Sequence, residues 1–196
     1  MTVGLAMHQM MLGQYAEARA TARHGLQLSY AAQDRMLICW GMDILGMIAL
    51  AEGRYDTAEQ LLRQTLILAR EVGRPEEQSS VLASLGYLAL KKGSAGQAQL
   101  HIRGGLQVVR DSHNIVAALL VLPTVALYLK LQGEVEQAHQ LVSLCKSFGF
   151  FRRSAFFAAL YGPHFGEGDT PRRETPETGT PTDALWHAAD SLICKI

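Results

Sequence analysis

The chain has few of the residues on which many kinds of functional site depend. Only three of its 196 residues are cysteines (Cys39, Cys145 and Cys194), and no two of them form a CxxC motif. An odd number of widely separated cysteines argues against both a disulfide framework and a zinc site. We therefore expect a reduced, cytoplasmic protein.

The chain also lacks an excess of charge of either sign. Lys plus Arg total 18 and Asp plus Glu total 18, so no overall field attracts nucleic acid or an anionic membrane surface. The most apolar stretch, 115–129, contains Pro123 and is shorter than the roughly 20 residues that span a bilayer. The N-terminus has neither the basic residues nor the cleavage site of a secretory signal. These absences predict no direct binding to nucleic acid and no membrane segment.

Familiar catalytic and cofactor-binding motifs are missing as well. The seven histidines show no HExxH spacing, no GxSxG is present, and the glycine-rich pieces at 93–96 and 166–168 lack a Walker lysine. We therefore predict no catalytic residue, no metal site and no cofactor, and thus a protein that is not an enzyme. An active site assembled between repeats is the alternative of a different class.

A repeat is the strongest feature that the sequence does contain. The segments 12–18, 52–58, 92–98 and 132–138 align at one constant interval, and each holds a glycine and an alanine in the same phase. The glycines are Gly13, Gly53, Gly93 and Gly133, and the alanines are Ala18, Ala58, Ala98 and Ala138. A fixed period of about 20 to 50 residues is typical of a solenoid.

Apolar residues on both sides of each glycine recur with helical spacing. Gly53 is expected to end one helix in a left-handed conformation, and Ala58 to lie where two helices cross closely. The pattern predicts an all-α, right-handed α-solenoid of about four helix pairs with a period of 40, a partial fifth pair, and a short C-terminal helix. Pro123 falls inside the first helix of the fourth pair, where it is expected to bend the helix.

Over residues 1–150 the chain resembles the tetratricopeptide repeat. The first-helix residues that carry the resemblance are Met42, Leu45, Gly46 and Ala49 in one repeat, and Leu82, Leu85, Gly86 and Ala89 in the next. The second-helix pairs are Ala58 with Leu62, and Ala98 with Ile102. The outer repeats depart from the family pattern, with Ala6 and Ala126 in place of the glycine, and its closing proline is missing. The segments 148–162 and 184–193 look like the C-terminal arm of bacterial signal-transduction ATPases and transcriptional activators.

This resemblance implies a binding site on the concave face, which the first helix of each pair lines. Carried over residue by residue, the family's groove positions give a set of partner-binding candidates: Trp40, Asp43, Met47, Tyr87, Lys91 and Lys130. Trp40 and Tyr87 are the expected anchors, because large aromatic side chains commonly dominate interfaces. We therefore predict a scaffold that binds a protein or peptide in an apolar concave groove. The alternative is the ligand- or peptide-sensing arm of a bacterial regulator whose effector domain lies outside this chain.

The composition divides the chain into three parts. Residues 1–165 form the repeat domain, 166–183 a flexible linker rich in Gly, Pro and Thr, and 184–196 an amphipathic helix. Three Thr-Pro dipeptides in the linker indicate either phosphorylation sites or an extended spacer, and the spacer is favoured. The apolar N-terminal helix has no polar cap, which predicts either a longer parent protein or a homo-oligomer that forms through this helix.

Overall fold

The computed structural model describes residues 2–165 and 180–196, which are helical and contain no strand. Eight helices make up the repeats: α1 (Thr2–Met11), α2 (Tyr15–Ala31), α3 (Arg35–Ala51), α4 (Tyr55–Glu71), α5 (Pro75–Lys91), α6 (Ala95–Ser112), α7 (Ile115–Leu131) and α8 (Val135–Ser147). Three shorter elements, α9 (Gly149–Arg152), α10 (Ala155–Tyr161) and the 3-10 helix η1 (Gly162–His164), follow them, and α11 (Pro181–Lys195) comes last.

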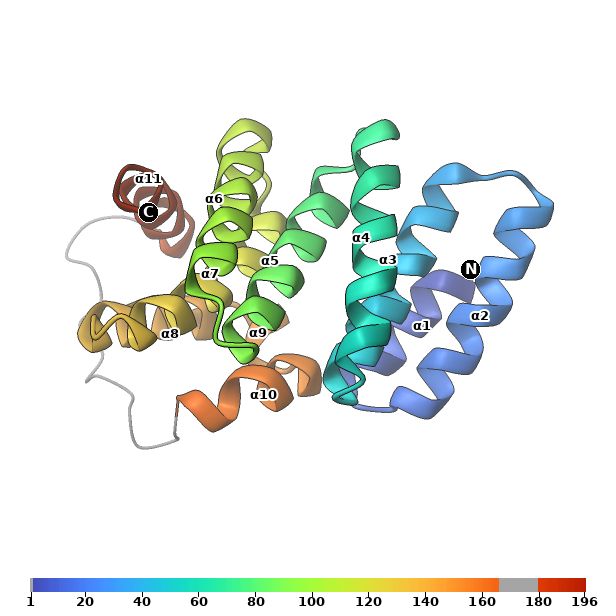
Figure 1. The fold of residues 1–196 in the computed structure, drawn as a ribbon, viewed down its shortest axis with the longest axis horizontal. Coiled ribbons are helices and arrows are strands. Elements are labelled where there is room, and N and C mark those ends of the chain that lie inside the picture. Colours follow the sequence, from blue (N-terminus) through green and yellow to red (C-terminus); the bar gives the residue numbers. More distant parts are fainter. Residues whose placement is uncertain (1, 166–179) are drawn as a thin grey trace.

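Helices that are consecutive in the chain pack against each other, so that four helix pairs stand side by side (Figure 1). The first helices α1, α3, α5 and α7 also contact one another in order. The predicted all-α helical-repeat solenoid is therefore confirmed.

The structure divides each repeat into two equal steps of one helix and one turn. From α2 to α7, and again at α8 and α10, helices begin at residues 15, 35, 55, 75, 95, 115, 135 and 155. Positive φ angles recur with the same step at 13, 33, 53, 73, 93, 113 and 133. The four glycines in phase thus end helices in the left-handed conformation, as predicted. The turns from the second helix of one pair to the first helix of the next use the same geometry, although two of these turns lack a glycine.

Gln33 is one of those two residues, with φ of 55° and an exposed side chain. A residue with a Cβ pays roughly 1 to 2 kcal/mol in the left-handed region, and glycine does not. We expect Gln33→Gly to raise the free energy of unfolding by about 0.5 to 1 kcal/mol, measured by urea denaturation.

The exposed Gln27 in the interior of α2 provides the matched control. The same change at a helical position, Gln27→Gly, should lower the free energy of unfolding by about 1 kcal/mol. Equal signs for the two variants would contradict the turn assignment at Gln33.

Small residues at fixed positions allow the helices of each pair to approach closely. The four alanines in phase are all fully buried. A Cβ on Gly46 would meet Cδ2 of Leu62 at 2.8 Å, so α3 and α4 cross with no room for a side chain there. Ala6 and Ala126, which replace this glycine in the outer repeats, are also fully buried.

We expect Ala58→Trp and Ala98→Trp to lower the free energy of unfolding by about 1 to 3 kcal/mol or more, because the packed crossing cannot take up the added volume. The comparison is Ala20→Trp at an exposed position of α2, which should stay within about 0.5 kcal/mol of the parent. Thermal melts of the three variants measure this difference. A melt of Ala58→Trp as close to the parent as that of Ala20→Trp would show that the crossing is misplaced.

The repeat pattern changes after α8. This helix has only 13 residues, whereas α7 has 17, and the chain then turns at Phe148 and Gly149. Although α10 begins in phase with the repeat, it folds back and packs on α1 and α3, the first helices of the first two pairs. The predicted fifth first-helix therefore exists only as a short helix that folds back over the earlier repeats.

The two ends of the chain are packed in different ways. In α1, Val3 and Met10 are buried within the chain, while Leu5 is half exposed, so only part of the predicted apolar surface is open. Self-association through α1 remains a prediction. The last helix, α11, packs on α6, α7 and α8 through buried apolar side chains. These are Leu185, Ala189 and Leu192, together with Ile196 just beyond the helix.

The predicted linker and its modification sites are only partly described. The first two Thr-Pro dipeptides, beginning at Thr170 and Thr175, lie outside the described residues. Thr180, in the third, is the N-cap of α11, and its hydroxyl accepts a hydrogen bond from the backbone N–H of Asp183. Asp183 completes a capping box by accepting from the backbone N–H of Thr180.

Candidate binding site on the inner helix face

The first helices of the four pairs share one surface of the molecule. We call this surface of α1, α3, α5 and α7 the inner face; it corresponds to the predicted concave groove. A segment of the same chain, residues 149–165, folds back after α8 and is named here the docked segment; its α9 packs on α8 and its α10 packs on α1 and α3 of the inner face. It comprises α9, α10, η1 and Phe165.

The docked segment is rich in aromatic side chains that are almost completely buried. The buried apolar residues are Phe151, Phe156, Phe157, Leu160, Tyr161 and Phe165. Phe157 lies at the centre, stacked on Phe151 at 4.6 Å and edge-on to Phe156 at 5.4 Å between ring centroids. Burial of such rings stabilises a contact by several kcal/mol. These rings therefore pack on one another and form the buried side of the segment.

At the α1 end, Ser154 is the N-cap of α10 and accepts a hydrogen bond from the backbone N–H of Phe157. Its hydroxyl also donates to Sδ of Met11 at 2.9 Å. A Cβ on Gly13 would lie 3.1 Å from Cβ of Ala155. The turn between α1 and α2 therefore has little room for a side chain at the point where α10 begins. The start of α10 is therefore fitted closely to the first helix pair.

In the middle, two tyrosines join the docked segment to α5 and α7. The Tyr87 hydroxyl donates to the backbone carbonyl of Leu160 at 3.3 Å, and its ring stands edge-on to Tyr161 with centroids 5.6 Å apart. The hydroxyls of Tyr161 and Thr124 share a hydrogen bond of 2.7 Å. Burial raises the pKa of Tyr87 to about 12 and that of Tyr161 well above its usual value, so both hydroxyls stay protonated.

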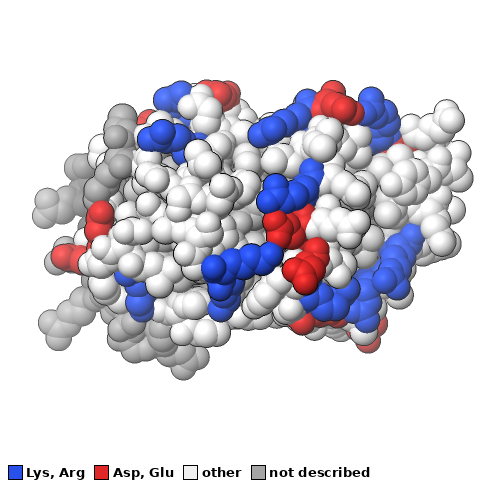
Figure 2. Space-filling model, viewed as in Figure 1, with Lys and Arg blue, Asp and Glu red and all other residues white. Residues whose placement is uncertain are grey.

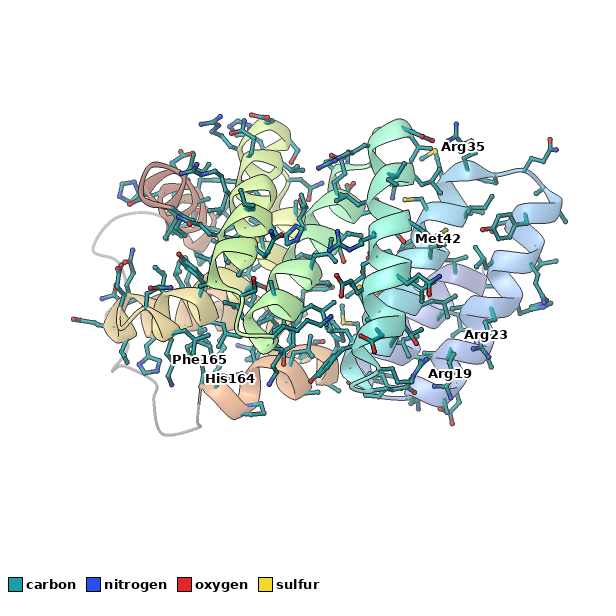
Figure 3. The ribbon with its side chains drawn as sticks, viewed as in Figure 1. Arg19, Arg23, Arg35, Met42, His164 and Phe165 are labelled. Atoms are coloured by element: carbon teal, nitrogen blue, oxygen red, sulfur yellow. The ribbon has the colours of Figure 1, made fainter. Side chains whose placement is uncertain are left out.

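At the α7 end, a lysine holds the last residues of the docked segment. Nζ of Lys130 donates to the backbone carbonyl of His164 at 2.5 Å and lies 5.1 Å from the centroid of the Phe165 ring. The same ring packs edge-on against His139 of α8 at 5.6 Å. Figure 3 shows His164 and Phe165 next to each other where the docked segment ends. Burial, together with Lys91 and Lys130, lowers the pKa of His164.

The six sequence-predicted site residues fall into two groups on the inner face. The first contains Tyr87, Lys91 and Lys130, which surround the second half of the docked segment; Lys91 lies with Nζ 5.5 Å from the centroid of the Tyr87 ring. The second contains Trp40, Asp43 and Met47, all on α3. Trp40 is half-buried. Its ring lies against α1, where a Cβ added to Gly4 would be 3.5 Å from the ring.

Sequence reasoning missed Met11 and Thr124, and it did not predict that the chain supplies its own segment to this face. The signal was present in the aromatic residues of 148–162, most of which come in adjacent pairs, Phe150 with Phe151 and Phe156 with Phe157, instead of following one helical stripe. Only the three-dimensional return of the chain after α8 shows where those side chains pack.

Asp43 and Met47 form a buried polar contact with the neighbouring repeat. Ser80 of α5 donates to Oδ1 of Asp43 at 3.1 Å and also lies 3.3 Å from Sδ of Met47. Burial raises the pKa of Asp43 well above its usual value, and the nearby Glu77 adds to this shift, although the Ser80 hydrogen bond opposes it. Glu77 itself pairs with Arg74 at 2.8 Å. Asp43 is therefore a carboxyl that the fold prefers to keep protonated.

The raised pKa of Asp43 predicts a pH-dependent stability. Its contribution is fully present below the unfolded pKa of about 4 and is lost as the pH rises through the folded value. We expect Asp43→Asn, which cannot ionise, to remove this decline and to stabilise the fold near neutral pH by about 1 to 3 kcal/mol. Urea unfolding between acidic and neutral pH measures both effects.

Asp56→Asn is the control, since Asp56 is fully exposed and should change stability by less than about 0.5 kcal/mol. A variant Asp43→Asn that follows the parent's pH dependence would show that Asp43 is ionised in the folded state.

The described residues contain no group of three or more His, Cys, Asp or Glu side chains that could hold a metal ion. Among the same residues, no helix is long and apolar enough to cross a membrane.

Pro123 lies within α7 and is buried, and the helix continues through it to Leu131.

The fold and the inner face define the class of protein: an all-α helical-repeat solenoid with a segment of its own chain docked across its first helices. Over 86 residues the chain is 35% identical to the regulatory protein AfsR of Streptomyces griseus. The match includes 44% of this chain but only 9% of the length of that protein. No family model matches the chain, and no solved structure matches it.

Proposed function

We propose that this chain is a protein-binding module of the tetratricopeptide type, and that its inner face recognises an aromatic-rich helical segment of a partner protein. The docked segment supports this proposal, because the inner face already binds a peptide of that kind. In three of the contacts, Tyr87 or Lys130 of the inner face binds a backbone carbonyl or the face of an aromatic ring of the docked segment. Such contacts do not depend on one particular peptide sequence.

In this proposal the docked segment is the internal competitor of the partner. A partner must displace it to reach the inner face, so the apparent affinity for the partner is the intrinsic affinity multiplied by the fraction of molecules in which the face is open. Tyr87, Lys91 and Lys130 bind either segment, whereas Trp40, Asp43 and Met47 stabilise the α3 surface beneath it. Such binding needs no catalytic group and no cofactor, and we propose that the protein is not an enzyme.

The similarity to the regulatory protein AfsR favours a regulatory role. We propose that the module acts as a sensing arm in the cytoplasm, with occupation of the inner face as the signal to an effector. A soluble peptide or protein is the expected partner, and not a nucleic acid.

The proposal is tested with a synthetic peptide that has the sequence of residues 148–165. Phe157→Ala in the full chain removes the central ring and weakens internal docking, by a loss typical of a buried aromatic of about 3 to 5 kcal/mol. We expect the labelled peptide to bind this variant, and to bind the parent at least about tenfold more weakly, because only the variant leaves the face open. Fluorescence anisotropy gives both affinities.

Two controls separate specific binding from nonspecific binding. Adding Tyr87→Ala to the Phe157→Ala chain should weaken the peptide about tenfold, since it removes an anchor that the peptide shares with the docked segment. A peptide with aspartate in place of its central phenylalanine should not bind. Equal binding by the parent and the Phe157→Ala chain would rule out the inner face as the site.

A further inference from the structure

A second candidate site lies on the opposite set of helices, between α2 and α4. There a cavity of about 280 Å³ opens to solvent. Its polar lining comes from α2, from α4 and from the N-cap of α4: Arg19, Arg23, Arg54, Thr57, Gln60 and Gln64. Arg19 and Arg23 lie one turn apart on α2 (Figure 3), and all the polar lining residues carry hydrogen-bond donors. We call this cavity the arginine groove.

The arginine groove carries more positive charge than the chain neutralises. Arg19 and Arg54 both form ion pairs with the same carboxylate, Glu52. Arg23 forms no ion pair with any residue that the structure describes, and its side chain is exposed. Three guanidinium groups therefore face one carboxylate. Figure 2 shows basic side chains gathered over this part of the molecule, with acidic ones at their edge.

Like charges one turn apart on a helix are unfavourable, by about 0.2 to 0.5 kcal/mol for each pair. Arg19 and Arg23 form such a pair, and helix propensity alone gives no reason for it, since uncharged residues propagate a helix equally well. An anion placed between the two guanidinium groups would turn this repulsion into attraction.

The equivalent positions one repeat later, on α4, are neutralised within the chain. One repeat later in the sequence, Glu59 takes the position of Arg19, and Arg63 takes that of Arg23. Glu59 accepts from Arg63 at 2.7 Å and from Lys92 at 2.6 Å, so the chain itself supplies the anion. A charge arrangement like that of the arginine groove is therefore not a requirement of the fold.

Two repeats on, the side chains at the equivalent positions of α6 bind an oxygen acceptor. Gln99 and Arg103 on α6 follow Glu59 and Arg63 by one further repeat. Both donate to the backbone carbonyl of Ile196, at 3.0 and 2.7 Å. The helix face that presents these positions thus holds an oxygen that arrives from outside the repeat. Of the three equivalent pairs, only Arg19 and Arg23 are both arginines, and the carboxylate of Glu52, which pairs with Arg19, neutralises only one of the charges.

From this comparison we infer that the arginine groove binds a phosphate monoester, held by Arg23 and Arg19 with Thr57, Gln60 and Gln64 as further donors. Arginine binds phosphate oxygens in pairs through its planar fork. A phosphate monoester carries a charge of about −1.5 to −2 near neutral pH, which matches the two positive charges left over after Glu52. A single carboxylate would neutralise only one of them. The ester can be a phosphorylated side chain of a protein or a small phosphorylated molecule.

Calorimetric titration at low ionic strength with phosphoserine and with a phosphoserine peptide tests the inference. We expect the parent to bind at least one probe and Arg23→Gln to weaken it about tenfold or more, since a charge-assisted bidentate contact is lost. Arg23 has no ion pair within the described residues, and its replacement removes the repulsion with Arg19, so it should not lower the melting temperature. A peptide that binds at least about tenfold more tightly than free phosphoserine identifies a protein source, and equal affinities identify a small molecule.

Arg63→Gln is the matched control, because Arg63 occupies the equivalent position but is already paired with Glu59. It should leave the affinity for the probe unchanged. The inference is overturned if neither phosphorylated probe binds, if Arg63→Gln and Arg23→Gln cost the same, or if a glutamate peptide binds as tightly as the phosphoserine peptide. These outcomes are independent of the inner face, which lies on the other helices.

Discussion

The structure depends on a backbone constraint: the chain must turn within three residues, with a left-handed residue in the turn, at every twentieth position from 13 to 133. A turn of this kind ends one helix and aims the next one back along it. Because five of the seven left-handed residues are glycines, most turns form without backbone strain. The uniform helix length then follows, since 17 residues of helix and three of turn complete each step. Equal lengths let every helix bury its apolar face against both neighbours.

The repeat, the helical class and the close crossings could be predicted from the sequence, because their signals are local. The structural roles of Gly53 and Ala58 depend only on the few residues around them. The shorter step of one helix and one turn was not visible, because Gln33 and His113 adopt the left-handed conformation without the residue type that indicates it. His113 adopts the left-handed conformation despite the backbone strain, and its ring contacts that of Trp186 on α11 with the centroids 5.7 Å apart.

The candidate site could be predicted only in part, for a reason of geometry. First-helix positions such as Tyr87 and Lys130 can be counted along the chain, and they do face the inner surface. What occupies that surface depends on the path of the chain after α8, which no spacing rule specifies. The arginine groove was missed because its charge stands out only when equivalent positions are compared. Arg23 resembles Arg63 in sequence, and the difference lies in the partner that each one has.

The docked segment also changes how the array holds together. In an ordinary solenoid each repeat touches only its neighbours, so stability is a sum of local terms and the ends can fray independently. Here Ser154 contacts Met11, two residues that are 143 positions apart, while Lys130 and Tyr87 hold the same segment further along. The segment therefore acts as a cross-brace that couples the first helix pair to the last. Loss of the brace would convert one cooperative unfolding transition into the stepwise unravelling of a linear array.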